Sequence, residues 1–142
     1  MSLSDTPQGE VETLRRLRRH RADRAERTLR EAKRAQQMLL AKIQQAQDAL
    51  EETQQEEARK SAQLLNQHQG QVLTLKALKS RGAQERSLSA STRRDMGQLE
   101  ALRDQRHAQE SRVGSAQKEV TQCLRQVEKL RELSLLLAQE SI

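Results

Sequence analysis

The side chains that could do chemistry are three histidines and one cysteine: His20, His68, His107 and Cys123. A metal site or an acid–base pair needs several such groups in one place, and along a helix that requires spacings of three or four residues. No two of the four are spaced in this way. We therefore expect histidines that are solvated or lie at a helix seam, and a Cys123 that packs as a small apolar residue.

The larger motifs of catalysis are also missing from the sequence. There is no Gly-rich phosphate-binding loop and no strand pattern that could support one. A narrow helical protein also lacks a cavity that could enclose a substrate. We expect that the protein is not an enzyme, and that it has no catalytic residues, no cofactor, no metal site and no small-molecule substrate.

The composition favours long helices over a globular core. The 142 residues include no Phe, Tyr or Trp, and only 34% are hydrophobic. Aromatic side chains supply much of the buried area of a compact core, so such a core is not expected here. Five glycines and one proline leave few helix breakers. A disordered chain and a pair of long helices with a thin seam remain as alternatives.

Apolar residues recur at alternating steps of three and four in two stretches, as in coiled coils. The first stretch is Ala22, Ala25, Leu29, Ala32, Gln36, Leu39, Ile43, Ala46 and Leu50. After it the spacing predicts a stutter through Gln54 and Ala58, and a seam that resumes as Ser61, Leu65, His68, Val72 and Leu75. The second stretch is Met96, Leu99, Leu102, Arg106, Gln109, Val113, Ala116, Val120, Cys123, Val127, Leu130, Leu133 and Leu137.

The segment between these stretches, from Lys79 to Asp95, contains Gly82, four serines and a threonine without apolar periodicity. We therefore predict an all-α fold, a long two-helix antiparallel coiled-coil hairpin with its turn near residues 80–95. A frayed N-terminus would cover residues 1–10, and a single hairpin residues 11–142. Helix one would span about 11–79 and helix two about 96–140. Parallel pairing of two copies is the alternative arrangement.

Ten of the 21 residues from Leu14 to Arg34 are Lys or Arg. A turn near residue 87 lets the second helix cover the first only back to about Gln36, so this basic segment is expected to lack an internal partner. Its arginines could contact the phosphates of RNA or DNA. Three acidic residues interrupt them, however, and no aromatic side chain is present to stack on bases, so nucleic acid is the weaker alternative.

Several features predict a cytoplasmic protein. Cys123 has no second cysteine to pair with, no apolar run approaches the length of a membrane span, and the first ten residues are polar. Membrane-surface binding by the basic segment is disfavoured because its apolar face is mostly alanine. An apolar ridge bordered by arginines instead favours docking to an acidic protein partner.

The pattern Leu14-x-x-Leu17-Arg18-x-x-Arg21-Ala22-x-x-Ala25-x-x-x-Leu29 is followed by a Gln-rich helix, a central break and a second helix. This layout resembles the bacterial type III secretion stalk proteins of the YscO/HrpO kind, which are related to flagellar FliJ. The resemblance implies a coiled coil at the base of the secretion apparatus, within the pore of the secretion ATPase hexamer. It further implies coupling to the export gate protein and binding to secretion chaperones.

Under this resemblance the two chain termini, which lie together at one end of the hairpin, enter the ATPase ring. The opposite tip, around Gly82 to Arg94, faces the gate or a chaperone. The partner-binding residues would then be Leu14, Arg15, Arg16, Leu17, Arg18, Arg19, Arg21, Ala22, Ala25, Leu29, Leu133, Leu136 and Leu137. A generic coiled-coil scaffold or adaptor is the competing function.

Overall fold

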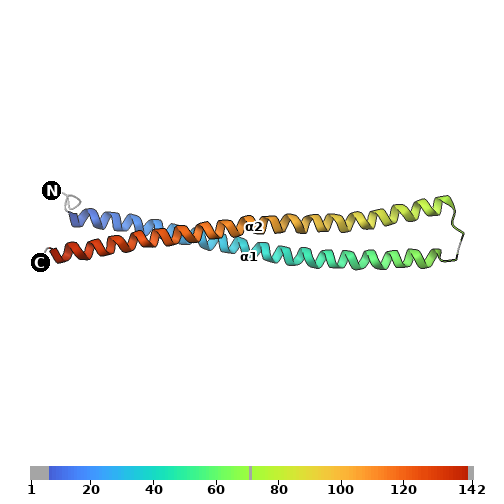
Figure 1. Cartoon of the computed structure of the whole chain (residues 1–142), viewed down its shortest axis with the longest axis horizontal. Helices are drawn as coiled ribbons and strands as arrows, with labels where there is room; N and C mark the ends of the chain where they lie inside the picture. Colours follow the sequence, from blue (N-terminus) through green and yellow to red (C-terminus); the bar gives the residue numbers. More distant parts are fainter. Residues whose placement is uncertain (1–6, 71, 141–142) are drawn as a thin grey trace. The chain divides into compact units, whose positions relative to one another are not determined.

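The computed structural model describes residues 7–70 and 72–140. They form two α-helices, α1 (Pro7–His68) and α2 (Leu75–Glu140), which pack against each other as a hairpin (Figure 1). The predicted all-α, two-helix fold is confirmed. Helix α1 begins at Pro7 because proline suits the first turn of a helix, where its missing N–H would be unpaired in any case. Of the predicted frayed N-terminus, Pro7–Glu10 is helical, and residues 1–6 lie outside the described residues.

The connection between the helices lies at residues 69–74, so the predicted turn at 80–95 is wrong. Gly70 has a φ of +75°, the left-handed conformation that commonly ends helices and that glycine adopts without steric cost. Helix α2 then starts behind Thr74, whose hydroxyl oxygen accepts a hydrogen bond of 3.1 Å from the backbone N–H of Ala77. This is an N-cap, which satisfies one of the unpaired donors of the new helix.

Residues 80–95 are helical because their polar side chains find partners that a helix can offer. The hydroxyl of Ser91 donates to the carbonyl four residues earlier, and that of Thr92 is shared between a carboxylate oxygen of Glu57 and, at 3.4 Å, the carbonyl of Leu88. Ser89 donates instead to a carboxylate oxygen of Glu57 on α1, at 3.1 Å. Gly82 lies within α2, at a cost of about 1 kcal/mol relative to alanine that the rest of the helix absorbs. The four serines are therefore helical, and Ser89 also joins the two helices.

The position of the connection makes the two helices nearly equal, with 62 residues in α1 and 66 in α2. Helix α2 consequently returns far enough to pack on the basic N-terminal segment of α1. Ala22 is only 1% exposed, and Val11 and Ala25 are also buried. The expectation that this segment lacks an internal partner is therefore wrong, and the error follows directly from the misplaced turn.

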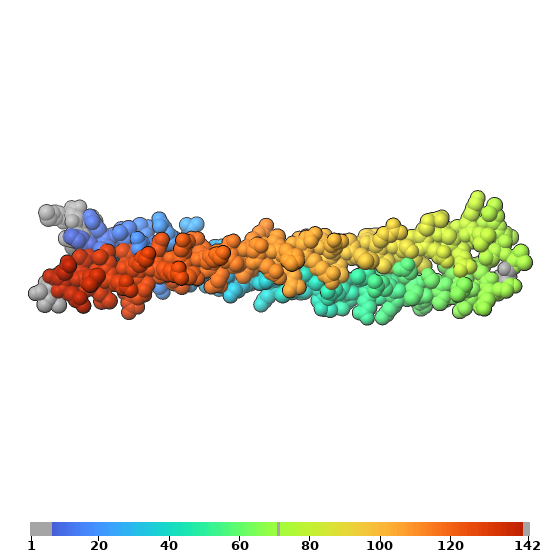
Figure 2. All heavy atoms as spheres, viewed as in Figure 1, coloured from blue at the N-terminus to red at the C-terminus, as the bar shows by residue number. Residues whose placement is uncertain are grey.

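The chain divides into two compact units, each built from one segment of α1 and one of α2. The terminal unit comprises the described residues up to Gln37 and from Ala108 onward. Figure 2 shows the side chains of its α2 segment, in red, lying directly against those of its α1 segment, in blue. Its buried residues are Val11, Ala22, Ala25, Gln109, Ala116, Val120 and Leu130. Gln109 is satisfied there, because its side-chain amide donates to the carbonyl of Ala32 at 2.9 Å.

The distal unit comprises Met38–His107 and has a different seam. Ile43 and Leu99 are its buried apolar residues among those described. Farther along, Thr53 donates to Asp95 at 2.6 Å, and Glu57 accepts hydrogen bonds from Ser89 and Thr92. We call these five residues the polar seam, because they join the helices through carboxylate–hydroxyl hydrogen bonds.

The predicted heptad positions from Ala22 to Leu50 are all buried or half-buried, as expected. The predicted stutter is present but displaced, because Gln54 and Ala58 are exposed and the two successive steps of four residues run from Thr53 through Glu57 to Ser61. The seam instead continues through half-buried positions at Thr53, Glu57, Ser61, Leu64 and His68. Leu65, Val72 and Leu75 are exposed beyond it, and on α2 the predicted seam positions Met96, Arg106 and Leu133 are exposed as well.

Candidate functional site

The terminal unit brings together both groups of residues that the sequence assigns to partner binding. One group lies on α1 between Leu14 and Leu29, and the other on α2 between Leu133 and Leu137. They are brought together because the antiparallel pairing places the end of α2 beside the start of α1. Gln8 and Val11 of α1, for example, line the same small depression as Ser134 and Leu137 of α2.

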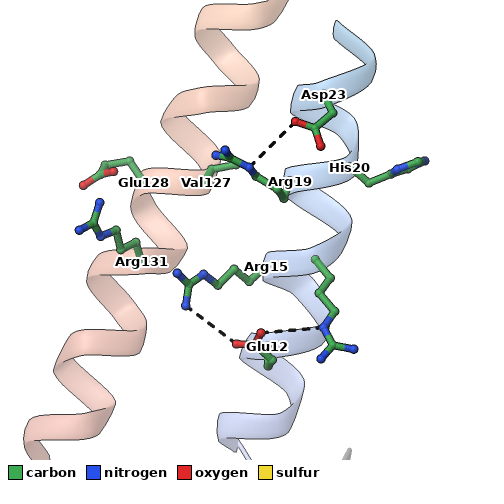
Figure 3. A pocket seen from close by; sticks show the side chains of 9 residues that line it. Glu12, Arg15, Arg19, His20, Asp23, Val127, Glu128 and Arg131 are labelled. Carbon is green, nitrogen blue, oxygen red and sulfur yellow. Dashed lines mark ion pairs between the residues drawn. The ribbon is translucent and has the colours of Figure 1, made fainter. Parts of the chain in front are cut away.

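A larger groove runs between the two helices of this unit. Its lining residues are Glu12, Arg15, Arg16, Arg19, His20 and Asp23 from α1, with Val127, Glu128 and Arg131 from α2. In Figure 3, Arg15 and Arg19 extend from α1 toward α2, whereas His20 points away from α2. The groove therefore displays four guanidinium groups from two helices, interspersed with three carboxylates.

The ion pairs within this groove are long and exposed. Glu12 is 3.9 Å from both Arg15 and Arg16, and Arg19 is 4.0 Å from Asp23. All three pairs join residues of the same helix. Exposed pairs of this kind contribute about 0–1 kcal/mol each. The guanidinium groups are therefore held loosely, and a partner carboxylate could displace the internal ones at small cost, with the bidentate geometry that arginine offers.

Arg18 has a different role from its neighbours. Its side chain donates a hydrogen bond of 3.0 Å to the backbone carbonyl of Gln126 on α2. This is a contact between the two helices, and Arg18 is correspondingly half-buried. Arg18 therefore helps to hold the terminal unit together, in contrast to the groove arginines.

The exposed leucines form a second feature of the terminal unit. Leu14 and Leu17 on α1, and Leu133 and Leu136 on α2, are each between 43% and 57% exposed. Each pair is spaced by three residues, so its members share one face of their helix. Leu137 is half-buried against the start of α1. These leucines offer apolar contact area beside the charged groove.

Three of the predicted contact residues lie at the seam between the helices. Ala22 and Ala25 are buried between the helices, and Leu29 is half-buried. Their small or branched side chains pack the seam and set how closely α1 and α2 approach. Arg21 remains exposed. It lies close enough to Cys123 for its positive charge to act on the thiol.

The three histidines and Cys123 form no common site with acidic residues among the described residues. Cys123 is half-buried, and its thiol donates to a carboxylate oxygen of Glu119 at 3.6 Å. Burial, together with this hydrogen bond, raises the pKa of the Cys123 thiol, which disfavours the reactive thiolate. His68 lies in the last turn of α1, and its buried Nδ1 has no hydrogen-bond partner. Among the described residues, no group of His, Cys, Asp and Glu could hold a metal ion.

Sequence reasoning missed part of the groove. Glu12 and Asp23 were detectable, because they stand three or four residues from the arginines that they pair with. Glu128 and Arg131 were not, because their place opposite Arg15 and Arg19 depends on where the connection lies. A turn centred near residue 72 gives this alignment, and one near residue 87 does not.

No helix in the described part of the chain is both long and apolar enough to cross a membrane. A family model described as type III secretion protein YscO matches residues 11–142, nearly the whole chain. No curated protein and no solved structure matches the sequence.

Proposed function

Because this chain belongs to the YscO family of type III secretion proteins, we propose that it is a non-catalytic stalk of the secretion apparatus. The terminal unit docks in the pore of the secretion ATPase hexamer, at the cytoplasmic base of the apparatus. The distal unit extends toward the export gate protein and the secretion chaperones. The observation that carries this proposal is the joint placement of the groove arginines and the exposed leucines on one unit.

The groove supplies charge and the leucines supply apolar contact. Arg15, Arg16 and Arg19 are exposed and only loosely paired, so carboxylates lining a ring pore could engage them. Leu14, Leu17, Leu133 and Leu136 add apolar area on the same unit. A stalk that turns or tilts inside a ring needs contacts that can break and re-form. Exposed guanidinium–carboxylate pairs, worth about 0–1 kcal/mol each, meet that requirement.

Charge reversal of the groove tests this proposal. The variant R15E/R16E/R19E should lose its stimulation of ATP hydrolysis by the purified cognate ATPase, because three attractive contacts become repulsive. Arg18 is left unchanged because its hydrogen bond to Gln126 stabilises the hairpin. Circular dichroism of the variant should show unchanged helicity, since each internal pair that is lost contributes little.

A matched control lies on the same helix of the same unit. The variant R27E/R30E/R34E reverses three exposed arginines outside the groove, so the net charge changes equally. It should retain ATPase stimulation. Equal loss of stimulation in both variants would show that only the total charge matters. If both variants retained stimulation, the groove would not be part of the contact with the ATPase.

The distal unit contains the connection at residues 69–74 and the adjoining helix ends. The segment from Gly82 to Arg94, which was expected to form the tip, lies inside α2. We assign the gate-facing and chaperone-facing role to the distal unit as a whole. Truncating both helices of this unit by matched lengths should abolish secretion in cells while the terminal unit still stimulates the ATPase.

A further inference from the structure

The distal unit carries an exposed apolar surface around the connection between the helices. We define the distal cap as Leu65, Val72, Leu75, Lys76, Leu78 and Lys79. Its four aliphatic side chains are between 49% and 101% exposed. Leu75 and Leu78 share a face of the first turn of α2, and Leu65 stands one turn before the end of α1. Exposed aliphatic side chains gathered at one end of a protein mark an interaction surface.

The charge of this region has a single sign. No Asp or Glu occurs between Glu57 and Glu85, whereas five Lys or Arg residues occur in that interval. Three of these five pair with carboxylates at its edges: Arg59 and Lys60 with Glu56, and Arg81 with Glu85. Lys76 and Lys79 take part in none of the ion pairs found among the described residues.

The start of α2 adds to this positive charge. Its first turn contains no acidic residue. The aligned peptide dipoles place about half a positive charge at a helix N-terminus, where a negative group is normally favourable. Two lysines at this position are unfavourable for the isolated helix, and a negatively charged surface would relieve the repulsion. The cap is therefore apolar and cationic at once.

We propose that the distal cap binds the surface of an anionic phospholipid bilayer. Lys76 and Lys79 would lie at the level of the lipid phosphates, and the aliphatic side chains would enter the boundary between headgroups and acyl chains. This contact does not depend on docking to the ATPase ring, which involves the other unit.

Two features favour a lipid surface over an acidic protein. The cations without a carboxylate partner in the cap are lysines, whose point charges suit the diffuse charge of a membrane, whereas arginine suits bidentate recognition of individual carboxylates. The aliphatic residues are also spread over two helix ends and their connection, rather than along one helix face. The aromatic and arginine anchors that dominate protein interfaces are missing from the cap.

The cap also limits how deeply this contact can penetrate. Residues 69, 70 and 72–74 are outside the helices, and among them the carbonyl of Thr74 accepts a hydrogen bond from the N–H of Leu78. Backbone groups there without such a partner need water or lipid headgroups. The contact is therefore interfacial. Its strength should fall as salt rises, because the Debye length is about 10 Å at 0.1 M and shrinks at higher ionic strength.

Vesicle binding by the full chain, without any secretion partner, tests the proposal. The protein should co-sediment with vesicles of phosphatidylglycerol and phosphatidylethanolamine, and far less with vesicles of phosphatidylcholine. In K76Q/K79Q the affinity for the anionic vesicles should fall about 30-fold, since each lysine near such a surface contributes roughly a factor of five. V72Q/L75Q should weaken binding as well, by removing apolar contact.

Matched controls come from the same unit. K42Q/R103Q removes two exposed positive charges, and M38Q/L40Q removes two exposed aliphatic side chains. Position 42 is 26 residues before the end of α1, about 39 Å along the helix, beyond the reach of a surface held at the cap. Both controls should bind the anionic vesicles as the unaltered protein does.

Two results would overturn the proposal. One is the absence of binding to anionic vesicles at low salt. The other is an equal loss of binding in K76Q/K79Q and K42Q/R103Q, which would show only general attraction of a basic protein. If the cap variants bind vesicles normally but fail to bind the purified cytoplasmic domain of the export gate, the cap is a protein-docking surface instead. Because the ATPase assay reports on the terminal unit, failure here leaves that assignment intact.

Discussion

At the residue scale, neighbouring arginines of the same basic segment have different tasks. Arg16 is 82% exposed and pairs weakly with Glu12. Arg18, two residues later, reaches across to the carbonyl of Gln126 on the other helix. Position along the helix determines which role each arginine has. Arg18 lies four residues before buried Ala22, on the face that meets α2.

Replacing Arg18 by alanine should therefore lower the free energy of unfolding by about 0.5–1.5 kcal/mol, the usual value of one such hydrogen bond. Urea denaturation followed by circular dichroism would measure this. Arg16→Ala is the control and should change stability by less than about 0.5 kcal/mol. A similar loss in both variants would contradict a special role for Arg18.

Glu56 gives a residue-scale prediction that depends on pH. Hydrogen bonding from Arg59, assisted by Lys60, lowers the pKa of the Glu56 carboxyl below its ordinary value of 4.5. The ionised form is thus favoured in the folded state, so its stabilising contribution is present above about pH 4.5 and is lost as the pH falls through the lowered pKa. Glu56→Gln should be less stable than the unaltered protein at neutral pH, and the difference should vanish in acid.

Thermal melts over a range of pH would test the Glu56 prediction. Glu51→Gln, which removes an exposed carboxylate from the same helix, is the control for the loss of one negative charge. A difference between Glu56→Gln and the unaltered protein that persists unchanged at low pH would mean that the pairing with Arg59 and Lys60 is not its cause.

At the scale of the elements, the position of the helix connection decides which residues meet. The heptad pattern from Ala22 to Leu50 was readable from the sequence because every seam contact there uses the same local spacing. The connection was not, because the serines near Gly82 are typical of a loop. In the structure the hydroxyl of Ser91 donates to a carbonyl of the same helix, and that of Ser89 donates to Glu57, which is 32 residues away in sequence.

The true connection does have a local signature, although it is a weaker one. His68 stands in the last turn of α1, Gly70 follows it, and Thr74 provides the cap of α2. The apolar spacing of Leu65, Val72 and Leu75 concealed this signature, because it continues a heptad across the break. The groove residues on α1 were predictable because their spacing is local. Their neighbours on α2 were not, because the alignment of the two helices depends on where the connection lies.

Two glycine substitutions distinguish the two positions for the turn. Gly70→Ala should destabilise the protein by about 1 kcal/mol, because alanine is strained at a φ of +75°. Gly82→Ala should stabilise it by up to about 1 kcal/mol, because the position is helical. The nearest atom to an added side chain there is the flexible end of Arg86, at 3.4 Å. Chemical denaturation would measure both changes in the free energy of unfolding. If Gly82→Ala were destabilising and Gly70→Ala stabilising, the turn would lie near Gly82.

The polar seam predicts uneven protection from hydrogen exchange. No described apolar residue between Ile43 and Leu99 is buried. Backbone amides near Glu57 and Thr92 should therefore exchange about tenfold faster, or more, than those near Ala22 and Val120, because less buried surface is lost when the helices separate there. Mass spectrometry of exchanged peptides would show this difference. Uniform protection along both helices would contradict it.

At the scale of the whole molecule, residues that form hydrogen bonds between α1 and α2 are farther apart in sequence the farther they lie from the connection. Thr53 and Asp95 are 42 residues apart, Ala32 and Gln109 are 77 apart, and Arg18 and Gln126 are 108 apart. The short connection thus organises contacts over the full range of the chain. Apolar burial is concentrated at the larger separations, since Ile43 and Leu99 are the buried pair nearest the connection among the described residues.

This distribution predicts which substitutions slow folding. Leu99→Ala should reduce the refolding rate strongly, because burial at Leu99 is the first large gain in apolar contact. Leu64→Ala, at a half-buried position nearer the connection, should mainly accelerate unfolding. Stopped-flow circular dichroism over a range of urea concentrations would separate the two rates. The opposite pattern would place the folding nucleus at the connection.

The polar seam therefore has a kinetic consequence. Zipping outward from Gly70 closes the shortest loops first, but it brings hydrogen bonds whose net gain over water is small. The helices must therefore be held together, at a cost in entropy, before any apolar residue is buried as fully as Ile43 and Leu99 are. We expect this hairpin to fold more slowly than helical proteins with local contacts, with its barrier crossed only when pairing reaches Ile43 and Leu99.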